Sequence, residues 1–306
     1  MTKPPIRFDP AVRTALDTGA PVVALESTII THGMPWPDNL AMLERVETAV
    51  RDHGATPATI AVIDGTIRIG LSATDAETLA KASGTLKLSR ADLAFACAEG
   101  LTGGTTVAAT MMAAHGAGIA VFATGGIGGV HQGAETSFDI SADLDELART
   151  PVTVVSAGAK AILDIPKTLE ALETRGVPVI AVGQDEMPAF WSRGSGLDAP
   201  LRLDDADAIA RFVAMRTELA DYRHGGILVA NPVPADAEIP HAEMAVFIAQ
   251  AQAEAARQGI AGKQVTPWLL ARIVEITGGR SLLTNIALVE SNARLGAEIA
   301  VALARR

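Results

Sequence analysis

The hydrophobic pattern of this chain alternates between short apolar runs and segments with a helical period. Predominantly apolar runs of strand length lie at residues 22–25, 59–63, 119–122, 152–155, 178–182 and 226–230. Apolar residues at helical spacing follow several of these runs, for example at Leu40, Leu43, Val46 and Val50. Alternating strands and helices predict an α/β fold, with three layers (α/β/α) and a mostly parallel central sheet.

Turn and capping residues refine this outline. Asp9-Pro10 predicts a helix start, and Asp64-Gly65 predicts a hairpin turn between two strands. Thr74 is expected to cap a helix, and residues 103–106 to open one. Residues 91–98 are interpreted as a strand or a buried turn. Further helices are expected over 38–53, 144–148, 166–174 and 204–219, and from 242 onward. Because no low-complexity linker or fixed-period repeat interrupts the chain, residues 1–306 are expected to form one domain.

Composition narrows the classes of function. The chain has 306 residues, 49% of them hydrophobic and 4% aromatic, and a formal net charge of −10. Phosphate backbones attract cationic proteins, so nucleic acid is not an expected partner. The single cysteine, Cys97, has no partner for an internal disulfide. No apolar run reaches the roughly 18 residues that span a membrane, and the N-terminus lacks an apolar leader. We therefore expect a soluble, cytoplasmic protein without a membrane partner.

Candidate chemistry is densest in residues 121–144, VFATGGIGGVHQGAETSFDISADL. The stretch leaves an apolar strand, passes four glycines and then presents His131, Glu135, Asp139, Ser141 and Asp143. Glycines let the backbone approach a ligand closely, and α/β sheets bind ligands beyond the carboxyl ends of their strands. The glycines do not match the dinucleotide spacing GxGxxG, because His131 occupies the place of the third glycine. The carboxylates suit a hard divalent cation or serve as helix caps.

Polar residues also follow other predicted strands. Glu26 comes directly after one, where a carboxylate either acts as a general acid or binds backbone N–H groups. Lys160 follows the small residues SAGA, and a lysine in a partly apolar pocket can form an imine with a carbonyl. Lys87 is a second candidate, because a neighbouring cation favours the neutral form of a nucleophilic amine. The alternative for Lys160 is a solvated surface position, and that for Lys87 is a charge on an edge strand. Glu26, Lys160 and Asn231 are expected to converge on one crevice with the central stretch.

Residues 103–106, GGTT, are a candidate phosphate cradle. Free backbone N–H groups and the positive end of a helix favour an anion. The segment lacks the lysine of a P-loop, so nucleoside triphosphate hydrolysis is not supported. A plain glycine turn with a threonine cap is the alternative.

Eight segments resemble those of the pseudouridine-5′-phosphate glycosidase family, also called the indigoidine-synthase-A-like family. They are VVALESTIITHGMP (22–35), PATIAVIDG (57–65), KLSRADL (87–93), TTVAATM (105–111), the central stretch 121–144, SAGAKAILD (156–164), VANPVP (229–234) and GKQVTPWLLARIVEITGG (262–279). The resemblance extends from about residue 9 to 303. It implies a homotrimer with an α/β/α core, a manganese ion (Mn²⁺) at the site, and reversible cleavage of pseudouridine 5′-phosphate to uracil and ribose 5-phosphate.

The resemblance also implies roles for individual residues. Lys160 would be the nucleophile that forms an imine with ribose C1′, and Glu26 would be the proton donor. Asp139 would hold the metal. The residues expected to contact substrate are Lys87, Val107, Ser141, Ala142 and Asp143, with His131 and Asn285 near the uracil.

The chemistry of a C-glycoside agrees with these roles. Such a bond has no heteroatom leaving group at C1′, so an amine attached there supplies the electronic assistance needed to break the bond to uracil. A glycosidase with two catalytic carboxylates would not need the lysine. Two alternatives remain open. One is a Schiff-base aldolase or lyase acting on another sugar phosphate, and the other is a non-catalytic protein that binds sugar phosphates.

Overall fold

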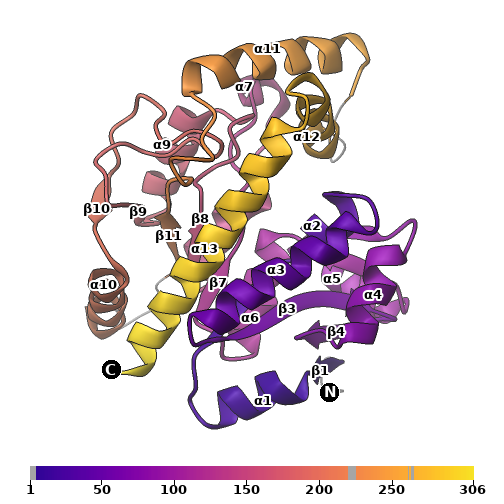
Figure 1. Cartoon of the computed structure of the whole chain (residues 1–306), viewed down its shortest axis with the longest axis vertical. Helices are drawn as coiled ribbons and strands as arrows, with labels where there is room; N and C mark the ends of the chain where they lie inside the picture. Colours follow the sequence, from indigo (N-terminus) through magenta and orange to yellow (C-terminus); the bar gives the residue numbers. More distant parts are fainter. Residues whose placement is uncertain (1–4, 220–224, 261, 263–264) are drawn as a thin grey trace.

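The computed structural model describes residues 5–219, 225–260, 262 and 265–306. Residues 1–4 of the predicted domain, and residues 263–264 within one of the resembling segments, lie outside the described part. An eleven-stranded sheet forms the centre of the described structure, and helices cover it (Figure 1). No helix in the described ranges combines the length and apolar character needed to cross a lipid bilayer.

The sheet is mostly parallel, as the apolar runs predict. Its strands are β1 (Ile6–Phe8), β2 (Val22–Leu25), β3 (Thr56–Ile63), β4 (Thr66–Ile69), β5 (Leu86–Leu88), β6 (Gly103–Thr105), β7 (Val121–Ala123), β8 (Thr153–Ser156), β9 (Val179–Val182), β10 (Leu201–Leu203) and β11 (Ile227–Ala230). The order is β1-β4-β3-β2-β7-β8-β11-β9-β10, and β6 pairs with β3 and β5. Only β4 and β6 run antiparallel to their neighbour β3. Strands β2, β8 and β11 are buried along their whole length, and β2 and β11 are accordingly apolar at every position.

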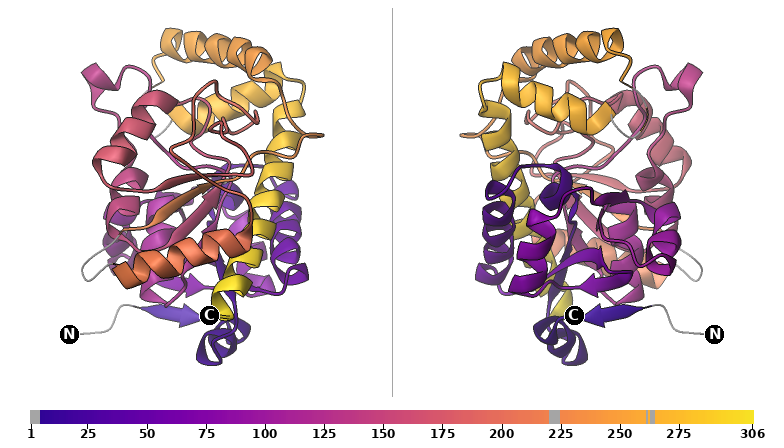
Figure 2. Two further views of the ribbon diagram at one scale, coloured as in Figure 1. Left: turned by 90° about the vertical axis from the view of Figure 1, so that its left-hand side faces the viewer. Right: turned by 90° about the vertical axis from the view of Figure 1, so that its right-hand side faces the viewer.

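Helices form a layer on each face of the sheet, which completes the predicted α/β/α arrangement (Figure 2). One layer contains α3 (Asp38–Asp52), α10 (Ala206–Leu219) and α13 (Arg280–Ala304). The other contains α5 (Arg90–Ala98), α6 (Val107–Gly116), α8 (Ala142–Arg149) and α9 (Ile165–Thr174). Small residues permit close packing: a Cβ on Gly296 of α13 would lie only 3.2 Å from the Cβ of Ala123 in β7.

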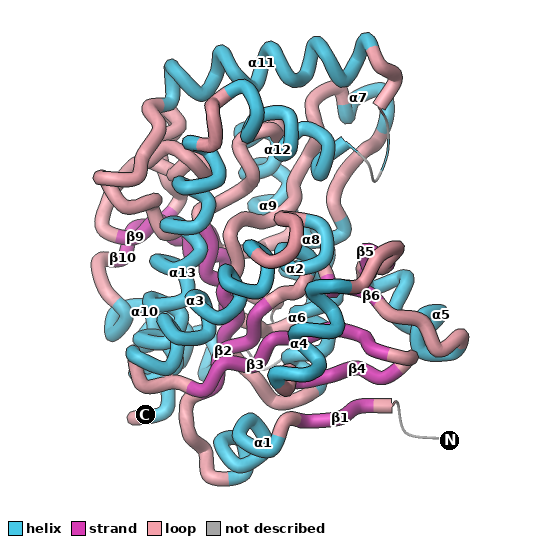
Figure 3. Tube along the Cα trace, turned by 45° about the vertical axis from the view of Figure 1, so that its right-hand side comes forward, coloured by secondary structure: helices cyan, strands magenta, loops and turns pink. Residues whose placement is uncertain are grey.

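The remaining helices lie around these layers. They are α1 (Pro10–Asp17), α2 (Thr28–His32), α4 (Ala73–Lys81), α7 (Ala134–Ser137), α11 (His241–Arg257) and α12 (Val265–Ile276). Figure 3 shows α7, α11 and α12 together at one end of the molecule, with β1, α1 and the C-terminus at the other end. One hydrophobic cluster runs from α1 to α13 through the sheet and both layers.

Several local predictions are confirmed. Asp9 caps α1 by accepting a hydrogen bond from the backbone N–H of Ala11 at 2.8 Å, with Pro10 in the first turn. Asp64 and Gly65 both have positive φ, and they join β3 to β4 as an antiparallel hairpin.

Two local predictions are wrong. Residues 91–98 form the helix α5, whose start is fixed by a capping box between Ser89 and Asp92. Ser72, two residues before Thr74, caps α4 through its side chain. A third prediction is right in part, because Thr106 caps the helix α6, whereas residues 103–105 before it form the strand β6.

The direction in which the chain crosses the sheet changes between β2 and β7. Strand β2 leads through α3 to β3 on one side, whereas β7 leads through α8 to β8 on the other. At such a switch point the two connections diverge and leave a crevice beyond the carboxyl ends of the strands. Glu26, Thr124 and residues 157–160 follow β2, β7 and β8 directly, so they line up along this crevice.

Candidate active site

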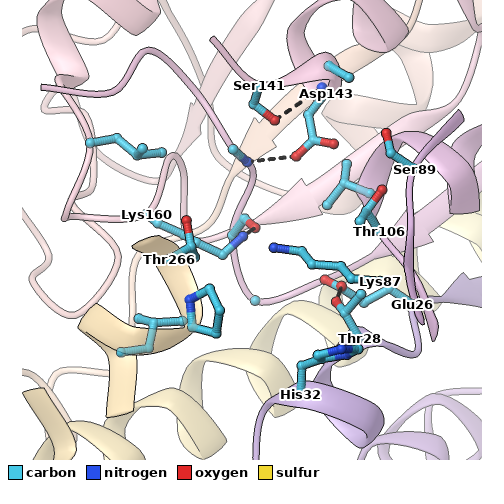
Figure 4. Close-up of a pocket in the computed structure, with 18 of the residues that line it drawn as sticks. Glu26, Thr28, His32, Lys87, Ser89, Thr106, Ser141, Asp143, Lys160 and Thr266 are labelled. Atoms are coloured by element: carbon cyan, nitrogen blue, oxygen red, sulfur yellow. Dashed lines mark hydrogen bonds between the residues drawn. The ribbon is translucent and has the colours of Figure 1, made fainter. Parts of the chain in front are cut away.

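A cavity of about 440 Å³ lies at the switch point, and all ten residues predicted for the site line it (Figure 4). They are Glu26, Lys87, Val107, His131, Asp139, Ser141, Ala142, Asp143, Lys160 and Asn285. Because they come from separate strand ends, loops and helices, their convergence depends on the parallel sheet and on α13. The predicted residues therefore form one site, although their individual roles remain predictions.

Glu26 occupies the position directly after β2. Its carboxylate accepts hydrogen bonds from two hydroxyl groups, Thr28 Oγ1 at the start of α2 and Thr124 Oγ1 at the end of β7. No backbone N–H donates to this carboxylate among the hydrogen bonds of the described residues, so the structural alternative weighed for Glu26 finds no support. The two threonines orient the carboxylate where it lines the cavity.

Lys160 reaches the cavity from the loop after β8. Its ammonium nitrogen Nζ donates to the backbone carbonyl of Gly126 at 2.6 Å. The two loops that carry these residues are joined by backbone hydrogen bonds, from Ile127 to the Gly158 carbonyl at 3.0 Å and from Lys160 to the Ile127 carbonyl at 3.1 Å. Figure 4 shows the side chains of Lys160 and Lys87 extending toward the same part of the cavity. Lys160 is therefore not a solvated surface lysine. Lys87 lies on the short strand β5, which pairs with β6 off the main order of the sheet, and it lines the cavity as well.

The N-termini of α6 and α8 meet at one end of the cavity. Asp143, which is 7% exposed, accepts hydrogen bonds from the backbone N–H of Ala108 at 2.9 Å and of Gly128 at 2.8 Å. Its carboxylate therefore connects the loop that contains Gly128 to the first turn of α6. Ser141 caps α8 beside it. Gly128 must be glycine here, because a Cβ would lie 2.2 Å from Ser141 Oγ.

The positive ends of two helices at one place form a suitable site for an anion. Val107 and Ala142 begin α6 and α8 and line the cavity, together with the cap residues Thr106 and Ser141. Of the predicted phosphate cradle at residues 103–106, only Thr106 lines the cavity, because residues 103–105 form the strand β6.

Two histidines line the cavity, and both are held toward the neutral form. Burial lowers the pKa of His131, the charges of Lys87 and Lys160 lower it further, and the carboxylate of Asp139 opposes the shift. His131 Nδ1 lies 4.0 Å from Asp139 Oδ2. Burial lowers the pKa of His32 as well, with a smaller contribution from the charge of Lys87. The cations of the site therefore favour imidazole groups without charge.

Asp139 provides one carboxylate at the cavity wall, and its side chain is 42% exposed. Across the described residues, no cluster of three or more His, Cys, Asp or Glu side chains could enclose a metal ion. These residues therefore do not fit a metal site in which the protein supplies all the ligands. They do fit a hydrated hard cation that is held through one carboxylate, with water or substrate oxygens as its other ligands.

The sequence analysis missed several residues of this site. Thr28, His32, Phe190 and Thr266 also line the cavity. Thr28 and His32 belong to the short helix α2, which immediately follows Glu26, so position after a strand end was an available signal. Phe190 and Thr266 come from a loop after β9 and from α12, which strand-end reasoning does not reach.

Asn231 does not join the site, contrary to expectation. Its side-chain amide donates to Ser291 Oγ at 3.1 Å and to Asn292 Oδ1 at 3.0 Å, and it is therefore held against α13. Asn292, fully buried, donates in turn to the carbonyl of Thr124 at 2.8 Å. Through these hydrogen bonds the two asparagines connect α13 to the residues that follow β11 and β7.

Comparison with known proteins shows to which family this chain belongs. A family model described as indigoidine synthase A like protein matches residues 11–302. The chain belongs to this family. The pseudouridine-5′-phosphate glycosidase of Paracoccus denitrificans is 64% identical over 303 residues, which cover 98% of this chain and 99% of the relative. That of Mesorhizobium japonicum is 65% identical over 301 residues, covering 98% of each chain.

Two solved structures with the same fold extend the comparison. The prealnumycin C-glycosynthase AlnA, in complex with ribulose 5-phosphate, superposes with a TM-score of 0.90 at 37% identity, covering 98% of this chain and 97% of the other. An indigoidine synthase A-like protein of Thermotoga maritima gives a TM-score of 0.88 at 35% identity, with the same coverage. The fold and the enzymatic character of the family are thus established over nearly the full length.

Proposed function

We propose that this protein is a pseudouridine-5′-phosphate glycosidase, which reversibly cleaves the C–C bond between ribose C1′ and uracil C5. The observation that carries this proposal is the meeting of Lys160, Glu26 and two helix N-termini in one cavity. These groups supply an amine nucleophile, a proton donor and an anion site, and relatives about 64% identical over the full length carry this enzyme's name. A role in pseudouridine catabolism follows from the reaction.

Lys160 is the proposed nucleophile. Its neutral amine forms a bond to C1′ while the C1′–O4′ bond of the ribose ring opens, and a proton from the amine passes to O4′, which becomes a hydroxyl group. The nitrogen lone pair then forms a C=N bond as the C1′–C5 bond breaks and a proton reaches uracil C5. Glu26 is the proposed donor of that proton, since its carboxyl group lines the same cavity. Water hydrolyses the resulting imine, which releases ribose 5-phosphate and restores the amine.

The phosphate group is proposed to bind where α6 and α8 begin. Val107, Ser141 and Ala142 bring backbone N–H groups and a hydroxyl there, and Lys87 adds a positive charge. Asp143 serves this end indirectly, because its carboxylate holds the backbone of Ala108 and Gly128 in place.

Uracil is proposed to lie beside His131 and Asn285. The side-chain amide of Asn285 has one acceptor and two donors, which complement the alternating carbonyl and N–H groups of a pyrimidine edge. His131 is neutral at pH 7 because its pKa is lowered, so it can donate one hydrogen bond without adding charge.

Asp139 would hold the manganese ion. A bound divalent cation there would offset the negative charge that the substrate brings into the cavity. The chain itself contributes two groups to this cation site. Asp139 supplies a negative carboxylate, and the nearby His131 is neutral and so adds no positive charge that would repel the cation. We further propose a homotrimer located in the cytoplasm, as the family resemblance implies, and light scattering of the purified protein tests the trimer.

Borohydride trapping tests the function directly. Incubation with ribose 5-phosphate and borohydride should reduce the imine and leave a covalent adduct, which mass spectrometry assigns to Lys160. Release of free uracil from pseudouridine 5′-phosphate then separates this enzyme from an aldolase, which would give the adduct without uracil. A binding protein would give neither. Lack of an adduct on Lys160, or full activity of Lys160→Ala, would contradict the proposal.

A further inference from the structure

Phe190 holds a backbone conformation that its residue type seldom adopts. Its φ is +60°, in the left-handed region, although its side chain is bulky and only 2% exposed. A non-glycine residue is strained in this region and persists there only where its surroundings determine the conformation. The position lies on the wall of the proposed active site.

The contacts that hold Phe190 connect three parts of the fold. Its backbone N–H donates to the carbonyl of Ala157, in the loop after β8, at 3.0 Å. Its ring meets that of Trp191 edge to face, with centroids 4.8 Å apart. Trp191 donates from Nε1 to the carbonyl of Ser281 in α13 at 3.1 Å. The turn that carries Phe190 is therefore fixed to the lysine-bearing loop and to α13.

The ring of Phe190 lies directly against Gly126. A Cβ placed on Gly126 would come within 2.7 Å of both Cδ2 and Cε2 of the ring, so only glycine leaves room for it. The carbonyl of this same glycine accepts the hydrogen bond from Lys160 Nζ at 2.6 Å. Phe190 thus contacts the peptide that orients the lysine.

We propose that Phe190 is a positioning residue for Lys160, acting through the backbone of Gly126; this inference rests on the proposed imine chemistry. A lysine amine sits on a flexible four-carbon stem, so it needs a fixed partner to present its lone pair in one direction. The peptide that carries this carbonyl is held on one side, because its N–H, that of Ile127, donates to the Gly158 carbonyl at 3.0 Å. The ring of Phe190 packs against the Cα of Gly126 and so limits the backbone freedom that a glycine otherwise has at the other side of that peptide.

The experiment measures the rate at which ribose 5-phosphate and borohydride label Lys160, per folded enzyme. In Phe190→Leu the flat ring is lost, and we expect the labelling rate and kcat to fall about 10- to 100-fold, the usual effect of misplacing a reacting group by about 1 Å. KM should change much less. Phe212→Leu, a half-buried phenylalanine on α10 outside the cavity, is the matched control and should label at the wild-type rate.

A second variant, at Gly126, keeps the test valid if Phe190→Leu folds poorly. Gly126→Ala places a methyl group against the ring and should slow labelling as well. Combining Gly126→Ala with Phe190→Leu makes room for that methyl group, so the double variant should label faster than Gly126→Ala alone.

The outcomes separate this inference from the proposed function. If the wild-type enzyme is labelled and Phe190→Leu is labelled equally fast, or the double variant gives no recovery, Phe190 has no positioning role. If the wild-type enzyme itself gives no adduct at Lys160, the proposed imine mechanism fails, and the inference fails with it.

Discussion

The hydroxyl group of Thr124 donates a hydrogen bond to the carboxylate of Glu26, across the boundary between β7 and β2. Thr28 donates a second hydrogen bond to the same carboxylate from the first turn of α2. The proposed proton donor is therefore oriented by elements on two sides. Asn292 extends this arrangement, since it holds the carbonyl of Thr124 from α13 at 2.8 Å.

Thr124→Val should lower kcat while leaving KM nearly unchanged. Valine keeps the branched shape but removes the donor, and a hydrogen bond to a charged group contributes about 1.5–3 kcal/mol, or roughly 10- to 100-fold in rate. Thr124 itself is not part of the cavity wall, so binding should be little affected. Steady-state kinetics with pseudouridine 5′-phosphate measure both constants. Thr124→Ser retains the hydroxyl and should behave like the wild type, whereas a fully active valine variant would contradict this role.

Asp143→Asn should weaken substrate binding more than it slows the chemical step. The carboxylate holds two backbone N–H groups at the proposed phosphate end, and an amide would turn its own N–H₂ toward one of them. Loss of one such bond predicts a rise in KM of about tenfold or more. Asp145→Asn, an exposed position on the same helix, is the control and should leave KM unchanged. An equal effect of both substitutions would count against the assignment.

Glu146→Ala should destabilise the fold. Glu146 is 1% exposed and accepts from Arg90 Nη2 at 2.6 Å, from Arg90 Nε and from Thr150, and the hydrogen bond to this carboxylate raises the pKa of Arg90. Because the side chain of Arg90 is 39% exposed, we expect a loss of about 2–3 kcal/mol, below the 3–5 kcal/mol typical of fully buried pairs.

Urea denaturation measures that loss as a difference in the free energy of unfolding. The control is Glu77→Ala, which breaks the exposed pair with Lys81 and should cost no more than about 0.5 kcal/mol. If the two substitutions cost the same, the ion pair between α5 and α8 is not an important contribution to stability.

Stability should fall in mild acid because of His32. Burial and the charge of Lys87 lower the pKa of His32 in the folded protein, while the unfolded chain takes up this proton near pH 6.5. Below about pH 6.5 the unfolded state therefore binds more protons than the folded state, and the free energy of unfolding decreases until the folded pKa is reached. Well above pH 6.5, where His32 is neutral in both states, its contribution to the free energy of unfolding is fully retained.

The comparison of His32→Asn with the wild type isolates this effect. The wild type should lose more stability than the variant between about pH 7.5 and pH 5, in urea denaturation at each pH. His115→Asn, which replaces an exposed histidine at the end of α6, should follow the wild-type profile. Parallel profiles for the wild type and His32→Asn would show that His32 does not titrate differently on folding.

Much of the sheet was predictable because its strands are buried on both faces. Continuous apolar runs such as 22–25 leave few other interpretations, and polar residues at their ends must then meet at one edge. Glu26 and Lys160 were found this way. The short edge strands β1 and β10 were missed, because they are largely exposed and contain arginines in place of an apolar pattern.

The missed parts of the site share a different cause. Phe190 and Thr266 enter the cavity from segments whose placement depends on tertiary packing, through Trp191 against α13 and through α12. No local period or strand end signals such contacts. Helix α5 was misjudged for a simpler reason: its apolar residues are nearly continuous, and the capping box at Ser89 was the signal that decided it.

Asp139→Asn should abolish the response of the enzyme to manganese. Asp139 is the carboxylate placed at the cavity wall beside the neutral His131, so its loss removes the charged ligand of the proposed hydrated cation. We expect Mn²⁺ affinity, measured by electron paramagnetic resonance of the free ion, to fall by about tenfold or more. Glu135→Gln is the matched control, because Glu135 lies in the same stretch but pairs with Lys167 at 3.0 Å. Wild-type activity that survives chelation unchanged, or equal Mn²⁺ binding by Asp139→Asn, would remove the metal from the proposed mechanism.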